Sequence, residues 1–107
     1  MDRRYYADLY KIKQGHKSGK KFYIFVEDNL TGEDEIFMFG DAKYEDYTMH
    51  KDPERKKNYR SRHANDYIND PMKPGFWSYW LLWNKKTLED SIVDTEKRYD
   101  IDIEYNG

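Results

Sequence analysis

The 107-residue chain contains no cysteine, which excludes a disulfide framework and any metal site built on thiolates. No apolar run reaches the roughly 18 residues that a membrane-spanning helix needs, and none of signal-peptide length follows Met1. The chain also lacks an internal repeat, a low-complexity segment and a linker. We therefore expect a single domain over residues 1–107 that neither spans a membrane nor is secreted by a signal peptide.

Apolar residues are scarce, but aromatic ones are plentiful. Charged residues make up 37% of the chain and mean hydropathy is −1.21, values that by themselves favour disorder. Eleven Tyr, five Phe and three Trp answer this objection. Each such side chain removes roughly 150–250 Å² from water when it is packed, so a core is expected.

The first forty residues have the pattern of a β-meander. Residues 5–13 alternate partly between apolar and charged side chains, residues 21–28 are aromatic and β-branched, and residues 36–39 form a third apolar run. A Gly-containing loop over 14–20 and a turn ending at Gly32 separate them. Residues 101–105 alternate apolar and acidic side chains, a pattern that suits an edge strand.

The remainder, residues 41–107, is mainly helical by its start and stop signals. Asp52-Pro53-Glu54 begins a helix that should reach about Tyr67 and align Arg55, Tyr59, His63 and Tyr67 on one stripe. The nine residues from Phe76 to Asn84 read as a buried helix, and Thr87 with Asp90 resembles a capping box for a helix ending near Asp100. We predict an α+β fold in which a three-stranded antiparallel meander packs against about three helices.

The first predicted helix carries a basic face. It could contact the phosphates of a nucleic acid, or it could be a solvated face with ion pairs within the helix. A net charge of −2 for the whole chain argues against strong nonspecific DNA binding. The six basic residues of this face are Lys51, Arg55, Lys56, Lys57, Arg60 and Arg62.

Three tryptophans follow one another at three-residue spacing, at Trp77, Trp80 and Trp83. They form either the hydrophobic core beneath the meander or an exposed anchor for a partner, because Trp is enriched at interface hot spots. Arginine side chains could also stack on these rings.

No arrangement in the sequence predicts an enzyme, a cofactor or a metal. Phosphate-binding loops, nucleophile elbows, zincin motifs and kinase motifs are all missing. His50, Asp52, His63 and Asp66 could be assembled on paper into a divalent-metal site. The simpler interpretation is a helix cap at Asp52 and hydrogen-bonded histidines.

Charge is unevenly distributed along the chain. Residues 1–26 hold seven basic and two acidic residues, whereas residues 87–107 hold two basic and seven acidic ones. This polarity suits head-to-tail contact between molecules, docking on a charged partner, or compensation within one molecule.

A longer motif resembles a known family. It comprises Phe39-Gly40, Tyr44, Asp46-Tyr47-Thr48, His50-Lys51-Asp52, Arg55-Lys56, Tyr59, Arg62-His63, Gly75-Phe76-Trp77-Ser78, Leu81-Leu82-Trp83-Asn84, Thr87-Leu88, Ser91-Ile92 and Asp94. Over about residues 36–99 the chain resembles an uncharacterised family of short proteins encoded by large DNA viruses of algae and protists and by some tailed phages. The resemblance implies a viral origin and transfers no catalytic residues.

The polar residues of this motif suggest a structural role. We expect a network that joins the sheet to the first helix, with Asp46 or Asp52 paired to Arg55 or Arg62, and His63 bonded to a Tyr hydroxyl such as that of Tyr59. Such a network would fix a rigid surface without chemistry.

The predicted function follows from these features together. We expect a viral structural or protein-interaction protein, a minor capsid or other virion component whose partners are other viral proteins, located in the virion or the host-cell cytoplasm. The alternative is a nucleic-acid-binding module that uses the basic helix over residues 51–62.

Overall fold

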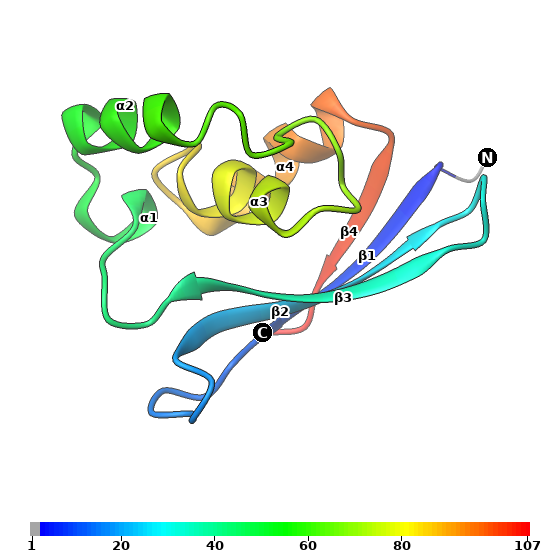
Figure 1. Ribbon diagram of the computed structural model, residues 1–107, viewed down its shortest axis with the longest axis horizontal. Helices are drawn as coiled ribbons and strands as arrows, with labels where there is room; N and C mark the ends of the chain where they lie inside the picture. Colours follow the sequence, from blue (N-terminus) through cyan, green and yellow to red (C-terminus); the bar gives the residue numbers. More distant parts are fainter. Residues whose placement is uncertain (1–2) are drawn as a thin grey trace.

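The computed structural model describes residues 3–107 and has an α+β fold (Figure 1). Its sheet contains β1 (Tyr5–Lys11), β2 (Lys20–Asp28), β3 (Asp34–Asp41) and β4 (Ile101–Tyr105), in the order β3-β2-β1-β4. The first three strands form the predicted antiparallel meander. The alternating tail adds β4 parallel to β1 at the far edge, so the sheet is a mixed one of four strands.

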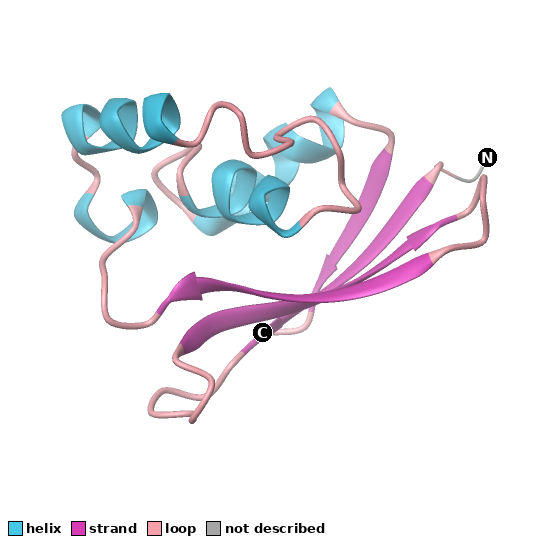
Figure 2. Cartoon of the chain, viewed as in Figure 1, coloured by secondary structure: helices cyan, strands magenta, loops and turns pink. Residues whose placement is uncertain are grey.

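All helices lie on one face of this sheet, and the other face is uncovered (Figure 2). The side chains of β1 and β2 alternate accordingly: Ala7, Leu9, Ile24 and Val26 point toward the helices and are fully buried. From β4, Ile101 joins them. Because these apolar side chains occur at every second residue, they lie on one face of the sheet, and the helices pack on that face.

The helical layer consists of α1 (Tyr47–His50), α2 (Pro53–Arg62), α3 (Pro74–Trp77), the π-helix η1 (Ser78–Leu82) and α4 (Leu88–Arg98). Both predicted N-terminal caps are present: Asp52 accepts from the amides of Glu54 and Arg55, and Thr87 Oγ1 accepts from the amide of Asp90. Among residues 3–107, no helix combines the length and apolarity required to cross a bilayer.

Helix α2 is shorter than predicted. It ends at Arg62, because His63 leaves helical geometry and its Nδ1 lies 2.6 Å from Asp66 Oδ2, closing a turn. Tyr67 has a φ of 58°, so it cannot continue a right-handed helix, and its side chain is exposed. Of the four residues predicted to share one helix face, Arg55 and Tyr59 lie in α2 and His63 is its C-terminal cap, whereas Tyr67 lies outside the helix.

The segment of three tryptophans belongs to the core, although it is not one regular α-helix. A single turn, α3, widens into η1, and this change brings Trp77 and Trp80 into the interior. Their indole N–H groups donate to the carbonyls of Pro71 (2.9 Å) and Ile68 (2.6 Å). The buried rings thus keep their polar atoms satisfied.

The strand-to-helix junction after β3 depends on Gly40. Gly40 has a φ of 79°, and a Cβ placed there would lie 2.7 Å from Leu82 Cδ1 in η1. A side chain at this position would therefore meet both an unfavourable backbone conformation and the core.

We predict that Gly40→Ala lowers the free energy of unfolding by about 2–4 kcal/mol, measured by urea titration, because backbone strain adds to steric overlap. Gly32→Ala is the matched control, since Gly32 has the same φ of 79° with nothing within 4 Å. The control should lose only about 1–2 kcal/mol. Equal losses in the two variants would show that contact with Leu82 contributes nothing.

Candidate functional site

One edge of the sheet is open along β3, since no strand of residues 3–107 lies beyond it. The amide of Asp28 donates to the carbonyl of Glu33 (2.8 Å), and the hydrogen-bonded pairs of β2 and β3 then recur at every second residue. The extended β3 residues between those pairs are Ile36 and Met38. Their N–H and C=O groups therefore point away from β2, toward the open edge.

The side chains at this edge are apolar and exposed. Ile36 is 64% exposed and Met38 50% exposed, and both belong to the uncovered face. Phe25 pairs with Ile36 there, and next to it Tyr10 and Tyr23 stack with ring centroids 4.8 Å apart. We call these five side chains the outer-face patch. An exposed apolar edge strand of this kind favours pairing with a further strand.

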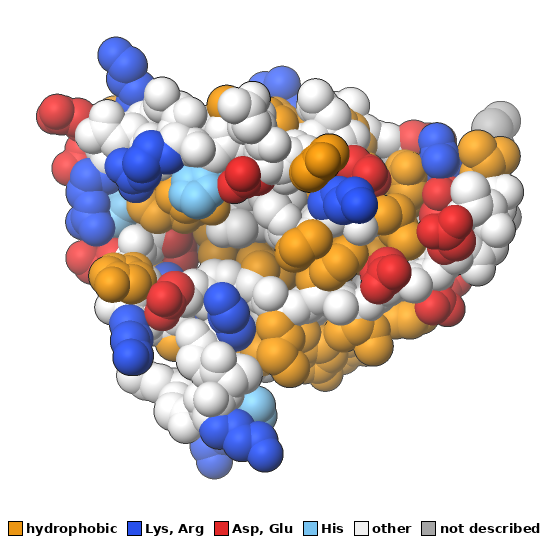
Figure 3. All heavy atoms as spheres, in the orientation of Figure 1, with side chains coloured by type: hydrophobic (Ala, Val, Ile, Leu, Met, Phe, Trp, Pro, Cys, Tyr) orange, Lys and Arg blue, Asp and Glu red, His pale blue; other side chains and the backbone are white. Residues whose placement is uncertain are grey.

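A cleft of about 730 Å³ opens beside the C-terminal end of β3. It lies between the sheet and the helical layer, and Figure 3 shows the molecule hollowed there, on the side where β3 is the foremost strand in Figure 1. The lining includes Lys20, Lys21, Met38, Phe39, Gly40, Asp41, Glu45, Asp46, Arg55, Asn58, Tyr59, Arg62, His63, Asp66, Gly75, Ser78, Leu82 and Trp83.

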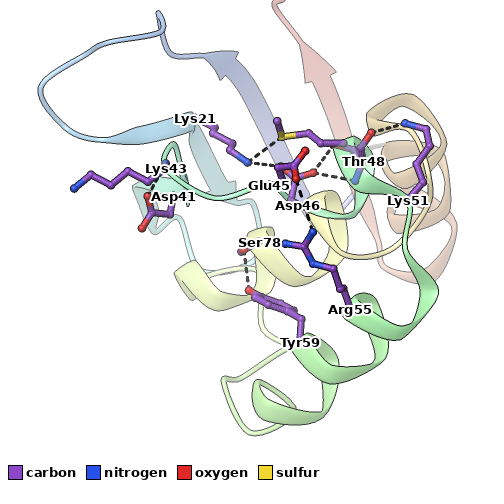
Figure 4. Close-up of polar contacts among 11 residues, drawn as sticks. Lys21, Asp41, Lys43, Glu45, Asp46, Thr48, Lys51, Arg55, Tyr59 and Ser78 are labelled. Carbon is purple, nitrogen blue, oxygen red and sulfur yellow. Dashed lines mark hydrogen bonds and ion pairs between the residues drawn. The ribbon is translucent and has the colours of Figure 1, made fainter.

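Stacked rings form one wall of the cleft. The ring of Tyr59 lies between Trp83 (centroids 4.2 Å apart) and His63 (4.1 Å), and His50 continues the column beyond Trp83 at 5.2 Å. The hydroxyl of Tyr59 hydrogen-bonds with Ser78 Oγ at 2.9 Å (Figure 4). Burial raises the pKa of Tyr59 above its ordinary value of 10, so the hydroxyl stays protonated near neutral pH.

At the other end of the cleft, Lys21 Nζ contacts Asp46 Oδ2 at 2.7 Å, and both side chains are largely buried (Figure 4). Asp46 also accepts from the amide of Thr48 and so caps α1. This ion pair ties β2 to the start of the helical layer. Removing one partner would leave the other buried and unpaired, which is strongly unfavourable.

The predicted pairings of the polar network are wrong. Asp46 pairs with Lys21 and Asp52 caps α2, so neither aspartate pairs with Arg55 or Arg62. Arg55 instead lies 3.8 Å from Glu45 Oε1.

His63 departs from the prediction in a similar way. It bonds to Asp66 and stacks on Tyr59 face to face, so the expected hydrogen bond to a Tyr hydroxyl is wrong. The prediction considered only charges along and next to one helix. It therefore did not identify Lys21 of β2 as the partner of Asp46, or Asp66 beyond the end of α2 as the partner of His63.

Most of the basic helix is occupied by contacts within the chain. Lys51 Nζ donates to the carbonyl of Thr48, Lys56 lies over the ring of Tyr47, and Arg60 lies 4.3 Å from the ring of Tyr79 and 5.1 Å from that of Trp80. Trp80 also receives Arg98 at 5.1 Å, so the predicted stacking of arginine on the tryptophans is present. Among the described residues, only Lys57 and Arg62 of the six show no such partner.

The divalent-metal site that His50, Asp52, His63 and Asp66 could form according to the sequence is not present. His50 Nδ1 accepts from the amide of Asp52, and His63 pairs with Asp66, so the four residues divide into two local pairs. Within residues 3–107, no three His, Asp or Glu side chains gather in a way that could hold a metal ion.

Opposite charges at the two ends of the chain meet partly within the molecule. Because β4 lies beside β1, Arg3 Nε approaches Asp100 at 3.9 Å and Asp102 at 3.8 Å, and Tyr6 donates to Glu104 at 2.6 Å. Compensation within the chain therefore accounts for part of the polarity. Asp2 lies outside the described residues.

Comparison with known families found a matching family model. A family model described as a family of unknown function (DUF5754) matches residues 10–63, half of the chain. The chain belongs to this family. The matched region runs from the end of β1 through α2, so it includes β2, β3 and the motif residues from Phe39 to His63, while the motif residues from Gly75 to Asp94 lie outside it. No curated protein and no solved structure matches the chain.

Sequence reasoning missed several members of the site. Lys21 stands outside the motif, and no local pattern indicated that it shares a cleft with Ser78 and Leu82, which stand within it. Gly40 and Gly75 did carry a signal, because each stands in the motif next to an aromatic residue. A Cβ at Gly75 would lie 2.7 Å from the carbonyl oxygen of Asp66, so both glycines allow close approach at the cleft.

We predict that His50 makes stability depend on pH. Burial and, to a lesser extent, the charge of Arg55 lower the pKa of His50 below its ordinary value of 6.5. The unfolded chain therefore binds the proton more readily, so stability is complete above pH 6.5 and falls as pH drops below it.

His50→Asn should flatten this dependence between about pH 7.5 and about pH 5.5, because an amide oxygen can accept from the amide of Asp52 without titrating. Urea unfolding at several pH values measures the slope. Met49→Leu, an exposed neighbour that does not titrate, is the control. A slope in His50→Asn equal to that of the wild type would contradict the assignment.

Proposed function

We propose that this protein is a small interaction protein that binds other proteins through the open edge of β3. The observation that carries the proposal is the combination of outward-directed backbone groups at Ile36 and Met38, unpaired among residues 3–107, with the 64% and 50% exposure of their side chains. Addition of an extended strand would satisfy these groups and cover the apolar side chains at the same time.

We further propose that the protein is encoded by a large DNA virus and serves as a minor capsid protein or another virion component. The motif from Phe39 to Asp94 supports this origin through its resemblance to viral proteins. Other viral proteins are then the partners, and the virion or the host-cell cytoplasm is the location. Assembly surfaces of this kind need rigid geometry and no catalytic group.

The chemistry of the cleft agrees with a binding role. The hydroxyl of Ser78 is engaged by Tyr59, and His63 is engaged by Asp66, so among the described residues of the cleft no nucleophile contacts a base. The basic residues of α2 are largely held by rings and carboxylates. Both facts favour protein contact over catalysis or phosphate binding.

We predict that purified particles of the encoding virus contain the protein at a fixed copy ratio, as measured by quantitative mass spectrometry. Met38→Pro should reduce this ratio at least about tenfold, because proline removes an N–H that faces the open edge while the ladder to β2 stays intact.

The matched control is Met38→Thr, which keeps the N–H and suits a strand. Circular dichroism of both variants verifies the fold. Absence of the wild-type protein from the particles would refute the virion assignment. Equal incorporation of wild type and Met38→Pro would refute the role of the edge.

A further inference from the structure

We infer that a partner at the open edge is a second copy of this chain, paired antiparallel through β3 about a twofold axis. This inference rests on the proposed use of the β3 edge and specifies its occupant. The result would be a continuous eight-stranded sheet with both helical layers on the same side. Closed twofold pairs are the commonest oligomers, because one self-complementary surface is sufficient.

The backbone of β3 defines a register for this pairing. Outward-directed groups alternate at Asp34, Ile36 and Met38, up to the point where Gly40 leaves extended geometry. If the axis passes beside Phe37, Ile36 of each copy exchanges hydrogen bonds with Met38 of the other, and Asp34 lies opposite Gly40. A register centred on Met38 would overlap the strand equally, but it would place Glu35 opposite Asp41 of the other copy, a like-charge pair that disfavours it.

Charge complementarity favours the same arrangement. The start of β3 is acidic, with Glu33, Asp34 and Glu35 all exposed. Antiparallel pairing places this start beside the end of the other strand, where Lys20 and Arg62 line the cleft. Of the carboxylates there, Glu45, Asp46 and Asp66 are engaged by Arg55, Lys21 and His63, and Asp41 lies across the ladder from Lys20. Glu35 then lies opposite Phe39 of the other copy, on the side of the sheet that faces the cleft.

Arg62 fits the role of acceptor for this carboxylate. It shows no ion-pair partner among residues 3–107, while the neighbouring cations Lys21 and Arg55 are engaged by Asp46 and Glu45. An acidic side chain from a second copy would supply the missing partner twice in a symmetric pair. An arginine and a carboxylate can also form two parallel hydrogen bonds.

The apolar surface agrees with this occupant as well. Ile36 and Met38 from the two copies would lie next to each other on the uncovered face, and the outer-face patch of each molecule would become half of one larger surface. Cross-strand pairs of apolar side chains are the unit that stabilises such a ladder. The β3 edge that is exposed in one molecule would be hydrogen-bonded to the second copy in the pair.

Sedimentation velocity of the full chain tests the inference, over concentrations from about 1 µM to about 1 mM. We expect a monomer–dimer equilibrium in the wild type. Met38→Pro should raise the dissociation constant at least about tenfold, and Met38→Thr should change it much less. Circular dichroism and thermal unfolding of each variant exclude a general loss of structure.

A charge exchange provides a second, independent readout. Glu35→Arg and Arg62→Glu should each weaken the dimer by about tenfold, and the double variant should recover most of the affinity, because the ion pairs re-form with reversed sign. Each single effect should shrink as salt rises from about 50 mM to about 500 mM. Additive losses in the double variant would overturn the proposed register.

A wild-type chain that remains monomeric at about 1 mM would overturn self-association. Incorporation into particles that still depends on Met38 would then show that the edge binds a different protein, and the proposed function would stand. Conversely, a dimer that is absent from particles would keep this inference and refute the virion role. The two failures are therefore distinguishable.

Discussion

The structure depends on one constraint: the helical layer covers a single face of the four-stranded sheet, and among residues 3–107 no strand pairs with the outer side of β3. Buried rings from α3 and η1 fill the space over Leu9, Ile24 and Val26. The Lys21–Asp46 ion pair then fixes the end of the sheet to α1. A chain of this size supplies one helical layer, so the second face and the outer edge of β3 remain open. The cleft lies between the C-terminal end of β3 and α2.

The motif from Phe39 to Asp94, of which the residues up to His63 lie in the family match, is explained largely by construction of this edge. Tyr59, Ser78 and Trp83 build the wall of the cleft, and Gly40 permits the close approach of β3 to Leu82. Asp46 caps α1, the short helix that leads the chain from the sheet to α2, and Asp52 caps α2 itself. Motif residues that could be mistaken for a catalytic set therefore have structural partners. Together they hold β3 and the cleft in a defined relation, as a binding surface requires.

Features with a local cause were predictable from the sequence. The strands of the meander, the cap at Asp52 and the cap at Thr87 each depend on residues that are close in sequence, and all three were confirmed. Features with a distant cause were not predictable. Arg60 looked like a free cation on a helix face, but it lies over Tyr79 and Trp80 from η1. The parallel placement of β4 beside β1 depends on a crossover that no local pattern encodes.

The most direct measurement is the exchange rate of the β3 backbone amides, followed by NMR at low and high protein concentration. In dilute protein, the outward amides of Ile36 and Met38 should exchange much faster than those of Phe37 and Phe39, which bond to β2. At high concentration the outward amides should become protected while the inward ones change little. Protection of Ile36 and Met38 in the dilute monomer, equal to that of Phe37, would show that the edge is already covered and would contradict the central claim.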